Sequence, residues 1–141
     1  MIPTEPPFVL SVVDSLNRHD LDGYASFYAE DAVLHDPAYP EPLQGRNAIR
    51  ADMANFFAGY PDAHFTLRSQ IQHDAATAIE LSISGTHTQP IHSPNGVIPP
   101  TNRAINLPMA LFTICNEQGL MVEERRYYDM AMLIRQLGLG H

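Results

Sequence analysis

Residues Gly119–Asp129 read Gly-Leu-Met-Val-Glu-Glu-Arg-Arg-Tyr-Tyr-Asp, and Met-Ala-Met-Leu-Ile-Arg-Gln-Leu-Gly follows at 130–138. The segment opens with apolar Leu120 and Val122, which predict a β-strand, and then gathers acidic, guanidinium and phenol side chains at 124–129. A strand that only filled a core would not carry so many ionisable groups, so we expect one face to line a cavity. The alternative is an edge or interface strand whose charges pair with each other across solvent.

The alternation of side chains along a strand divides these groups between two faces. Each face carries a carboxylate, a phenol and a guanidinium: Arg125, Tyr127 and Asp129 on one, Glu124, Arg126 and Tyr128 on the other. Inside a cavity, such a set would provide a general acid or base together with the neighbours that control it.

The composition of the chain fits one globular domain over residues 1–141, with 45% hydrophobic and 17% charged residues. At this length roughly two thirds of the unfolded surface is buried on folding, which is enough for a core and a small pocket. The net charge of −8 argues against a nucleic acid or an anionic membrane as a partner. All basic side chains are arginines, so Schiff-base chemistry on a lysine is excluded.

The single cysteine and the N-terminal segment indicate in which cellular compartment the protein is expected. Cys115 ends an apolar run, and no base is apparent beside it, so we expect a buried, inert thiol rather than a nucleophile. The first residues lack the basic and apolar regions of a signal peptide, and no apolar run is long enough to span a bilayer. We therefore expect a soluble, cytoplasmic protein.

Periodicity predicts the remaining elements. Apolar residues at helical spacing predict helices over about 7–18, 21–28 and 45–59, and alternation predicts strands over 30–37, 64–73, 77–89 and 103–116. The segment 90–102 contains four prolines and is typical of a lid or binding loop. Helices gathered on one side of a strongly curved antiparallel sheet predict an α+β fold, a cone-shaped barrel with a pocket at its open end.

Polar and aromatic side chains outside the opening segment are further candidates. His87 continues the apolar face of its strand, and it is either a core histidine bonded to a backbone carbonyl or a donor that lines the pocket. His35 and Asp36 form a polar pair before a proline-rich loop. Tyr24 and Tyr28 are most simply core residues, although a phenol that faces a cavity would be a ready donor.

The motifs of several other enzyme classes do not occur in the sequence. No histidine pair with a later glutamate stands at metal-ligand spacing, so no metal site is expected. Neither a glycine-rich phosphate loop nor a Gly-x-Ser-x-Gly elbow is present. Nucleotide cofactors and serine hydrolysis are therefore not expected.

Six phrases and the order of the predicted elements resemble one known family. The phrases are Phe27–Asp36, Gly45–Ile49, Gly85–His87, Ile98–Arg103, Val122–Asp129 and Arg135–Gly138. From about Phe8 to Leu139 the chain resembles the SnoaL-like polyketide cyclase (ester cyclase) family of the nuclear transport factor 2-like superfamily. These phrases are specific for the fold and less so for activity, because the superfamily also holds isomerases, dehydratases, epoxide hydrolases and non-catalytic binding modules.

The resemblance implies a cone-shaped pocket, usually in a homodimer, and an aldol ring closure without a metal or organic cofactor. The acid/base in such cyclases is an aspartate towards the C-terminal end of the sheet, which Asp129 matches best. The resemblance therefore favours the Asp129 face as the inner one, whereas the phase of Leu120 and Val122 favours the other. A β-bulge near Glu123 would reconcile the two indications.

The expected site follows from these arguments. The expected catalytic residues are Asp129, His87 and His35, and the expected substrate-binding residues are Tyr127, Arg125, Tyr24, Tyr28, Asp36, Phe56 and Glu124. The expected function is acid/base chemistry on a small, mostly apolar carbonyl compound, by intramolecular aldol reaction or isomerisation through an enolate. The alternative is a module of the same fold that binds a small ligand or a protein without turnover. Whether Asp129 and His87 point into one cavity distinguishes the two.

Overall fold

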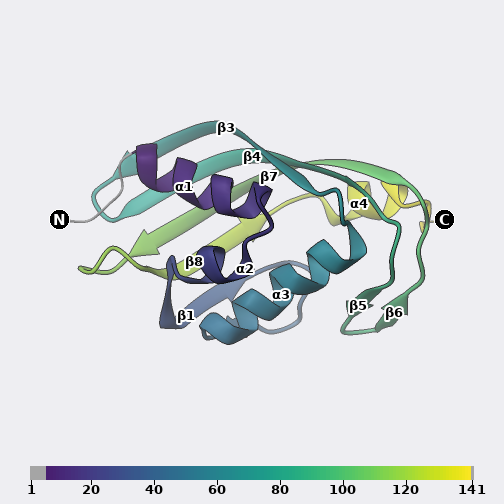
Figure 1. Ribbon diagram of the computed structural model, residues 1–141, viewed down its shortest axis with the longest axis horizontal. Coiled ribbons are helices and arrows are strands. Elements are labelled where there is room, and N and C mark those ends of the chain that lie inside the picture. Colours follow the sequence, from purple (N-terminus) through teal and green to yellow (C-terminus); the bar gives the residue numbers. More distant parts are fainter. Residues whose placement is uncertain (1–5, 141) are drawn as a thin grey trace.

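The computed structural model describes residues 6–140, and a curved six-stranded sheet is its largest element (Figure 1). Its strand order is β2-β1-β8-β7-β4-β3. The strands are β1 (Tyr28–His35), β2 (Leu43–Gln44), β3 (His64–His73), β4 (Ala76–Thr86), β7 (Ala104–Cys115) and β8 (Met121–Tyr127). The predicted α+β fold with a curved sheet is confirmed, but the sheet stays open, with β2 and β3 as its two edges.

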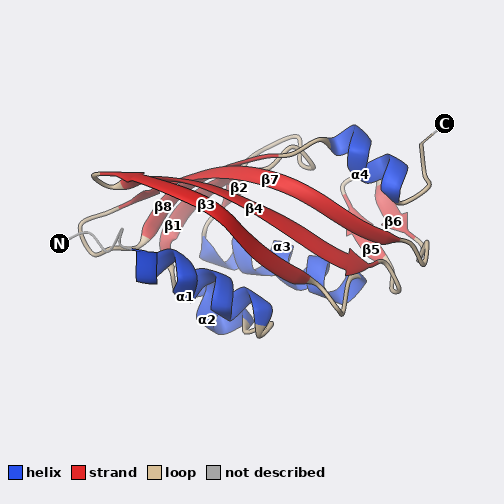
Figure 2. Cartoon of the chain, turned by 90° about the horizontal axis from the view of Figure 1, so that it is seen from above, coloured by secondary structure: helices blue, strands red, loops and turns tan. Residues whose placement is uncertain are grey.

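Helices α1 (Pro6–Asn17), α2 (Leu21–Ala25) and α3 (Arg46–Gly59) lie on one face of the sheet, as predicted (Figure 2). The short helix α4 (Met130–Gln136) follows β8 and packs against β7. The end of α1 is tied to β3 by Asn17, whose side-chain amide donates to the carbonyl of Phe65 at 2.9 Å and accepts from its N–H at 2.7 Å. This pair of bonds sets the position of α1 over the sheet.

The core lies between this face of the sheet and the helices. In β7 buried and exposed residues alternate without exception, because every second side chain points towards the helices. Its inward residues Ile105, Met109 and Leu111 belong to one apolar cluster with Val9 of α1 and Ile49 of α3. The helical face of the sheet is therefore apolar along most of its length.

Strand β8 is irregular at its start, and its charged half turns inward the face that the phase of Leu120 and Val122 favours. Its pairing with β7 shifts between Ile114, which faces Glu123, and Cys115, which faces Met121, so Val122 is an extra residue. Met121 points inward before this bulge, and Glu124 and Arg126 point inward after it. A bulge near Glu123 is thus present, but it turns the Glu124 face inward. The expectation that the Asp129 face is the inner one is wrong.

Two further predictions need correction, and a third segment has more structure than the loop predicted for it. The sheet is not wholly antiparallel, since β1 pairs with β8 in parallel. The second helix ends at Ala25, so Tyr28 opens β1 rather than closing a helix. The segment 90–102 contains a hairpin of its own, formed by β5 (Ile91–Ser93) and β6 (Gly96–Ile98), which is separate from the main sheet.

Candidate active site

A cavity of about 500 Å³ lies between the helical face of the sheet and helices α1 and α3. Most of its wall is apolar, with Val12 from α1, Phe56 from α3 and Leu111 from β7 among the lining residues. Helix α4 contributes Leu133, and the β5–β6 hairpin contributes Ile91. A pocket of this size accommodates a drug-sized organic molecule, and its walls favour an apolar one.

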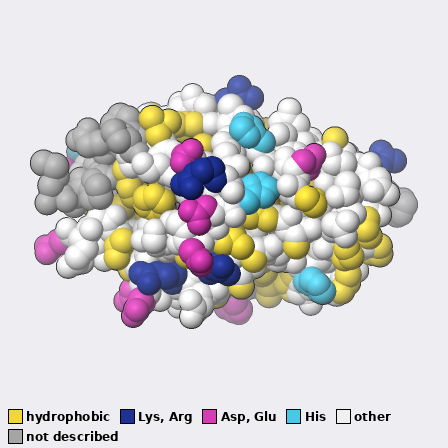
Figure 3. Space-filling view, in the orientation of Figure 1, with side chains coloured by type: hydrophobic (Ala, Val, Ile, Leu, Met, Phe, Trp, Pro, Cys, Tyr) yellow, Lys and Arg dark blue, Asp and Glu magenta, His cyan; other side chains and the backbone are white. Residues whose placement is uncertain are grey.

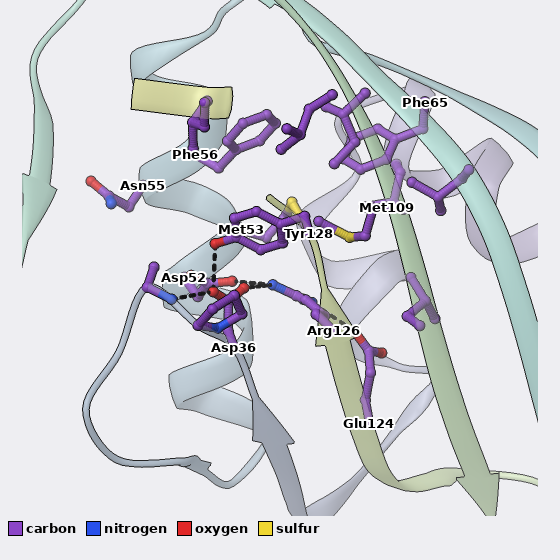
Figure 4. Close-up of a pocket in the computed structure, with 18 of the residues that line it drawn as sticks. Asp36, Asp52, Met53, Asn55, Phe56, Phe65, Met109, Glu124, Arg126 and Tyr128 are labelled. Carbon is purple, nitrogen blue, oxygen red and sulfur yellow. Dashed lines mark hydrogen bonds and ion pairs between the residues drawn. The ribbon is translucent and has the colours of Figure 1, made fainter. Parts of the chain in front are cut away.

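One region of the cavity is polar, and the guanidinium of Arg126 lies at its centre. Figure 4 shows Arg126 between Glu124 on one side and Asp36 and Asp52 on the other. Nε of Arg126 donates to Glu124 at 2.7 Å, and Nη1 donates to Asp36 at 3.1 Å and to Asp52 at 2.9 Å. These carboxylates come from β8, from the residue after β1 and from α3, so Arg126 joins three elements.

Each of the three carboxylates also accepts a hydrogen bond from one tyrosine. The hydroxyl of Tyr128 donates to Asp36 at 2.6 Å, that of Tyr39 donates to Asp52 at 2.5 Å, and that of Tyr28 donates to Glu124. A fourth phenol, that of Tyr24, lies 3.0 Å from the Tyr28 hydroxyl and accepts from Nη2 of Arg126 at 3.1 Å. The polar region is therefore a continuous network, in which charge-assisted bonds hold the carboxylates in place.

Burial determines the protonation of the donors in this network. Desolvation, reinforced by the neighbouring carboxylates, raises the pKa of Tyr28, Tyr39 and Tyr128 well above the ordinary value of 10.0. Burial opposes the charge on Arg126, but the surrounding carboxylates, Glu124 first, raise its pKa well above its ordinary value. Near neutral pH the tyrosines therefore remain protonated donors and Arg126 remains a cation.

The network contains more acceptors than donors. Three carboxylates face one guanidinium. Each carboxylate has about four lone-pair positions, and Asp52 and Glu124 each use two of them on Arg126 and a tyrosine. Lone pairs therefore remain on both carboxylates to accept a proton or a hydrogen bond from a ligand.

Comparison with known proteins agrees with this architecture. The profile of the SnoaL-like polyketide cyclase family matches residues 8–137. The chain belongs to this family. Among solved structures, IdmH of Streptomyces antibioticus, a candidate polyketide cyclase, is similar with a TM-score of 0.75 at 24% identity, covering 94% of this chain and 96% of IdmH.

Two other structures are similar to this SnoaL-like chain. A protein from Catenulispora acidiphila with a ketosteroid isomerase-like fold, solved with trimethylamine, has a TM-score of 0.78 at 19% identity and covers 97% of this chain and 96% of its own. SalBIII, an epoxide hydrolase/cyclase-like enzyme in pyran ring formation of the polyether salinomycin, has a TM-score of 0.71 at 16% identity, covering 89% of this chain and 90% of SalBIII. At such identities the likeness concerns the fold alone.

Within residues 6–140, the helices of the SnoaL-like chain are too short or too polar to cross a lipid bilayer.

The cavity brings together five of the expected substrate-binding residues. Its walls include Tyr24, Tyr28, Asp36, Phe56 and Glu124. Their contact with a substrate remains a prediction.

The other two lie on the opposite face of β8. Arg125 is exposed and pairs with Glu123, and Tyr127 is 54% exposed with its ring 5.9 Å from that of Phe112. Neither belongs to the cavity wall. Their expected place in the pocket is therefore wrong, because the bulge at Val122 sets the phase of the strand.

Asp129 also lies outside the cavity. Strand β8 ends at Tyr127, and Asp129 is the exposed N-cap of α4, where its carboxylate accepts from the N–H of Met132 at 3.0 Å. Aspartate is one of the preferred residues at this position, because its oxygen satisfies a free N–H of the first turn. The expectation that Asp129 points into the pocket is therefore wrong.

The two expected histidines are separated from the cavity as well. His87 is fully buried, and its Nδ1 accepts from the N–H of Thr101 at 3.2 Å, next to the hydroxyl of that residue at 3.0 Å. It is not among the cavity-lining residues, so it is a core residue, but the expected bond to a backbone carbonyl is not found, and Nε2 has no hydrogen-bond partner within residues 6–140. His35 is half-buried and lines a smaller hollow beside Asp36 and Arg126. Asp129 and His87 thus share no cavity.

Sequence reasoning missed four members of the network. They are Tyr39, Asp52, Arg126 and Tyr128. Asp52 was detectable, since it stands beside Met53 and four residues before Phe56, on the side of the helix that carries its apolar stripe. Arg126 and Tyr128 share the strand phase of Glu124, so one correct assignment of the inner face would have found both.

Proposed function

We propose that this protein is a cofactor-independent acid/base enzyme that acts on a small, mainly apolar carbonyl compound through an enolate, as a polyketide cyclase-like or isomerase-like catalyst. The observation that carries the proposal is the network around Arg126, which presents three buried carboxylates to one mostly apolar cavity. Membership in the SnoaL-like polyketide cyclase family supports cyclase or isomerase chemistry in general.

Asp52 is the best candidate for the general base. Its side chain is 13% exposed, against 6% for Asp36 and 5% for Glu124, so it is the most accessible of the three carboxylates. Asp36 in addition accepts a third hydrogen bond, from the N–H of Ala38 at 2.8 Å. A proton on the carbon next to a substrate carbonyl would pass to Asp52, directly or through one water.

Arg126 supplies a donor for the oxygen that becomes negative. Nη2 of Arg126 has a second N–H besides the one given to Tyr24, whereas the single hydroxyl proton of Tyr128 is already given to Asp36. Loss of one well-placed donor of this kind typically costs about 2.7–4 kcal/mol of transition-state stabilisation. In a cyclisation, the enolate carbon then attacks a second carbonyl carbon of the same molecule, and the new alkoxide takes the proton back from Asp52.

Exchange of α-protons into deuterated water tests the first step without knowledge of the natural substrate. A panel of β-keto esters and polyketide-like ketones is followed by NMR, and Asp52→Asn is compared with the wild type. Proton transfer by a positioned base contributes about 10²- to 10⁴-fold, so Asp52→Asn should slow exchange by that factor and leave ligand affinity nearly unchanged. Asp129→Asn is the matched control and should catalyse exchange of the α-protons at the wild-type rate. Equal rates for Asp52→Asn and the wild type would exclude Asp52 as the base.

The second candidate function is binding without turnover. It is favoured by two observations: Asp129 and His87 share no cavity, and all three carboxylates already form hydrogen bonds within the network. A ketone that binds the wild type tightly but shows no exchange above the buffer rate would support this function over catalysis.

A further inference from the structure

Two buried threonines of the sheet have hydroxyl groups without a hydrogen-bond partner within residues 6–140. They are Thr77 on β4 and Thr113 on β7, each 1% exposed and directly opposite each other across the strand pair. A buried hydroxyl without a partner is destabilising, and such groups in folded proteins usually have a specific reason.

The two threonines differ in what they face. Thr113 lines the large cavity, whereas Thr77 is not among the lining residues. On its other side Thr113 pairs with Glu124 of β8. Side chains of directly opposite residues on one face lie close together, with Cβ atoms about 4.5–5.5 Å apart. The free hydroxyl of Thr113 and the carboxylate of Glu124 are thus neighbours on the cavity wall.

Glu124 has room for a further hydrogen bond. One of its oxygens accepts from Tyr28 and the other from Nε of Arg126 at 2.7 Å, which leaves about half of the lone-pair positions of a carboxylate free. A carboxylate only accepts, while the Thr113 hydroxyl both donates and accepts. The group that complements both is a hydroxyl, which donates to Glu124 and accepts from Thr113.

Charge favours a neutral ligand group at this place. An anion would be repelled by Glu124, and the attraction of Glu124 for a cation is reduced because Arg126 already pairs with it. We infer that Thr113 and Glu124 form a binding subsite for a neutral hydroxyl, from an alcohol, phenol or enol, on a ligand whose apolar body fills the rest of the cavity. The inference rests on the proposed function only in taking this cavity as the substrate site.

A pair of probes of equal shape tests the subsite, 2-naphthol and 2-methylnaphthalene, with binding measured by titration calorimetry or by probe fluorescence. The wild type should prefer 2-naphthol. Thr113→Val keeps the shape of the side chain and removes its hydroxyl. It should therefore lower the affinity for 2-naphthol by about 5- to 10-fold, the usual effect of one hydrogen bond, and change the affinity for 2-methylnaphthalene by less than about twofold. The control Thr77→Val, which removes the neighbouring buried hydroxyl, should change neither affinity.

Thr113→Ser keeps a hydroxyl and should retain the preference for 2-naphthol. This control distinguishes the loss of a hydrogen bond in Thr113→Val from a general change in packing. The subsite is ruled out if Thr113→Val and Thr77→Val bind 2-naphthol equally, if Thr113→Val weakens both probes alike, or if the wild type shows no preference. Because the readout is direct binding, this result is independent of the α-proton exchange that tests the proposed function.

Discussion

Arg126 is the residue on which the polar network depends, because it is the cation that three buried carboxylates share. Removal of the partner from a buried ion pair leaves uncompensated charge and typically costs about 3–5 kcal/mol. We therefore expect Arg126→Met to lower the free energy of unfolding by about that amount, measured by urea denaturation. Arg125→Met is the matched control on the outer face and should change stability by about 0–1 kcal/mol. Equal effects of the two variants would show that the network contributes no special stability.

Asp129 should matter for stability and not for turnover. As the N-cap of α4 it accepts a backbone hydrogen bond, and replacing such a cap by alanine costs about 0.5–2 kcal/mol. Asp129→Ala should lower the melting temperature, while Asp129→Asn, which keeps the capping oxygen, should not. A loss of α-proton exchange in Asp129→Asn would return this residue to the catalytic site.

His87 should make the fold sensitive to acid. Burial lowers the pKa of His87 in the folded protein below the ordinary 6.5, so the unfolded chain binds the proton more readily. The stability that neutral His87 contributes is therefore complete above pH 6.5 and is lost as the pH falls through the lowered pKa of the folded state. Urea denaturation from pH 7.5 down to 5 should show this decline, and it should be shallower in His87→Gln. Replacement of exposed His64 should leave the slope as in the wild type.

At the scale of the element, the side chain of Asn55 joins the β5–β6 hairpin to α3 by two hydrogen bonds. The amide of Asn55 donates to the carbonyl of His92 at 2.8 Å and accepts from its N–H at 3.0 Å, in the manner of a neighbouring strand. Since each bond is worth about 0.5–1.5 kcal/mol, Asn55→Ala should speed amide hydrogen exchange over residues 88–99 several-fold without changing exchange in β7. Asn95→Ala, at the exposed hairpin turn, should leave exchange unchanged. Unaltered exchange in Asn55→Ala would mean that other contacts hold the hairpin.

The whole molecule has two unlike faces. On the helical face, acidic and arginine side chains are intermixed, with ion pairs such as Arg18–Asp14 and Arg50–Asp22, both at 2.9 Å (Figure 3). The opposite face of the sheet bears exposed apolar side chains that the strand register places near one another. They are Ile71, Phe112, Ile114 and Tyr127. Exposed apolar groups gathered in this way mark an interaction surface.

We expect the chain to form a homodimer through this outer face. Light scattering after size exclusion should give twice the mass of 15.7 kDa for the wild type and the single mass for Phe112→Glu, because a charge at the centre of an apolar interface has no partner there. Leu10→Glu changes an equally exposed apolar residue on α1 and should remain dimeric. A wild type that stays monomeric at all concentrations would rule out this use of the face.

Most elements of the fold could be predicted from local patterns. The bounds of α1, α3, β3 and β7 lie within one residue of those that periodicity indicates, because apolar spacing reflects which side of an element meets the core. The same patterns found the cavity-lining Tyr24, Tyr28 and Phe56, since side chains on the apolar faces of these elements also border the space between them.

The amino-acid sequence by itself determined the family, the α+β architecture and the presence of a polar strand at residues 121–127 beside an apolar cavity. Only the tertiary structure decided which face of that strand lines the cavity, because the family resemblance and the phase of Leu120 and Val122 favour opposite faces. The extra residue Val122, visible only in the pairing of β7 with β8, places Met121 and Glu124 on the same side of the strand. It also decided that Asp36 and Asp52, on separate elements, share the guanidinium of Arg126. Long-range ion pairs of this kind leave no periodic signal in the chain, since they depend on how whole elements pack.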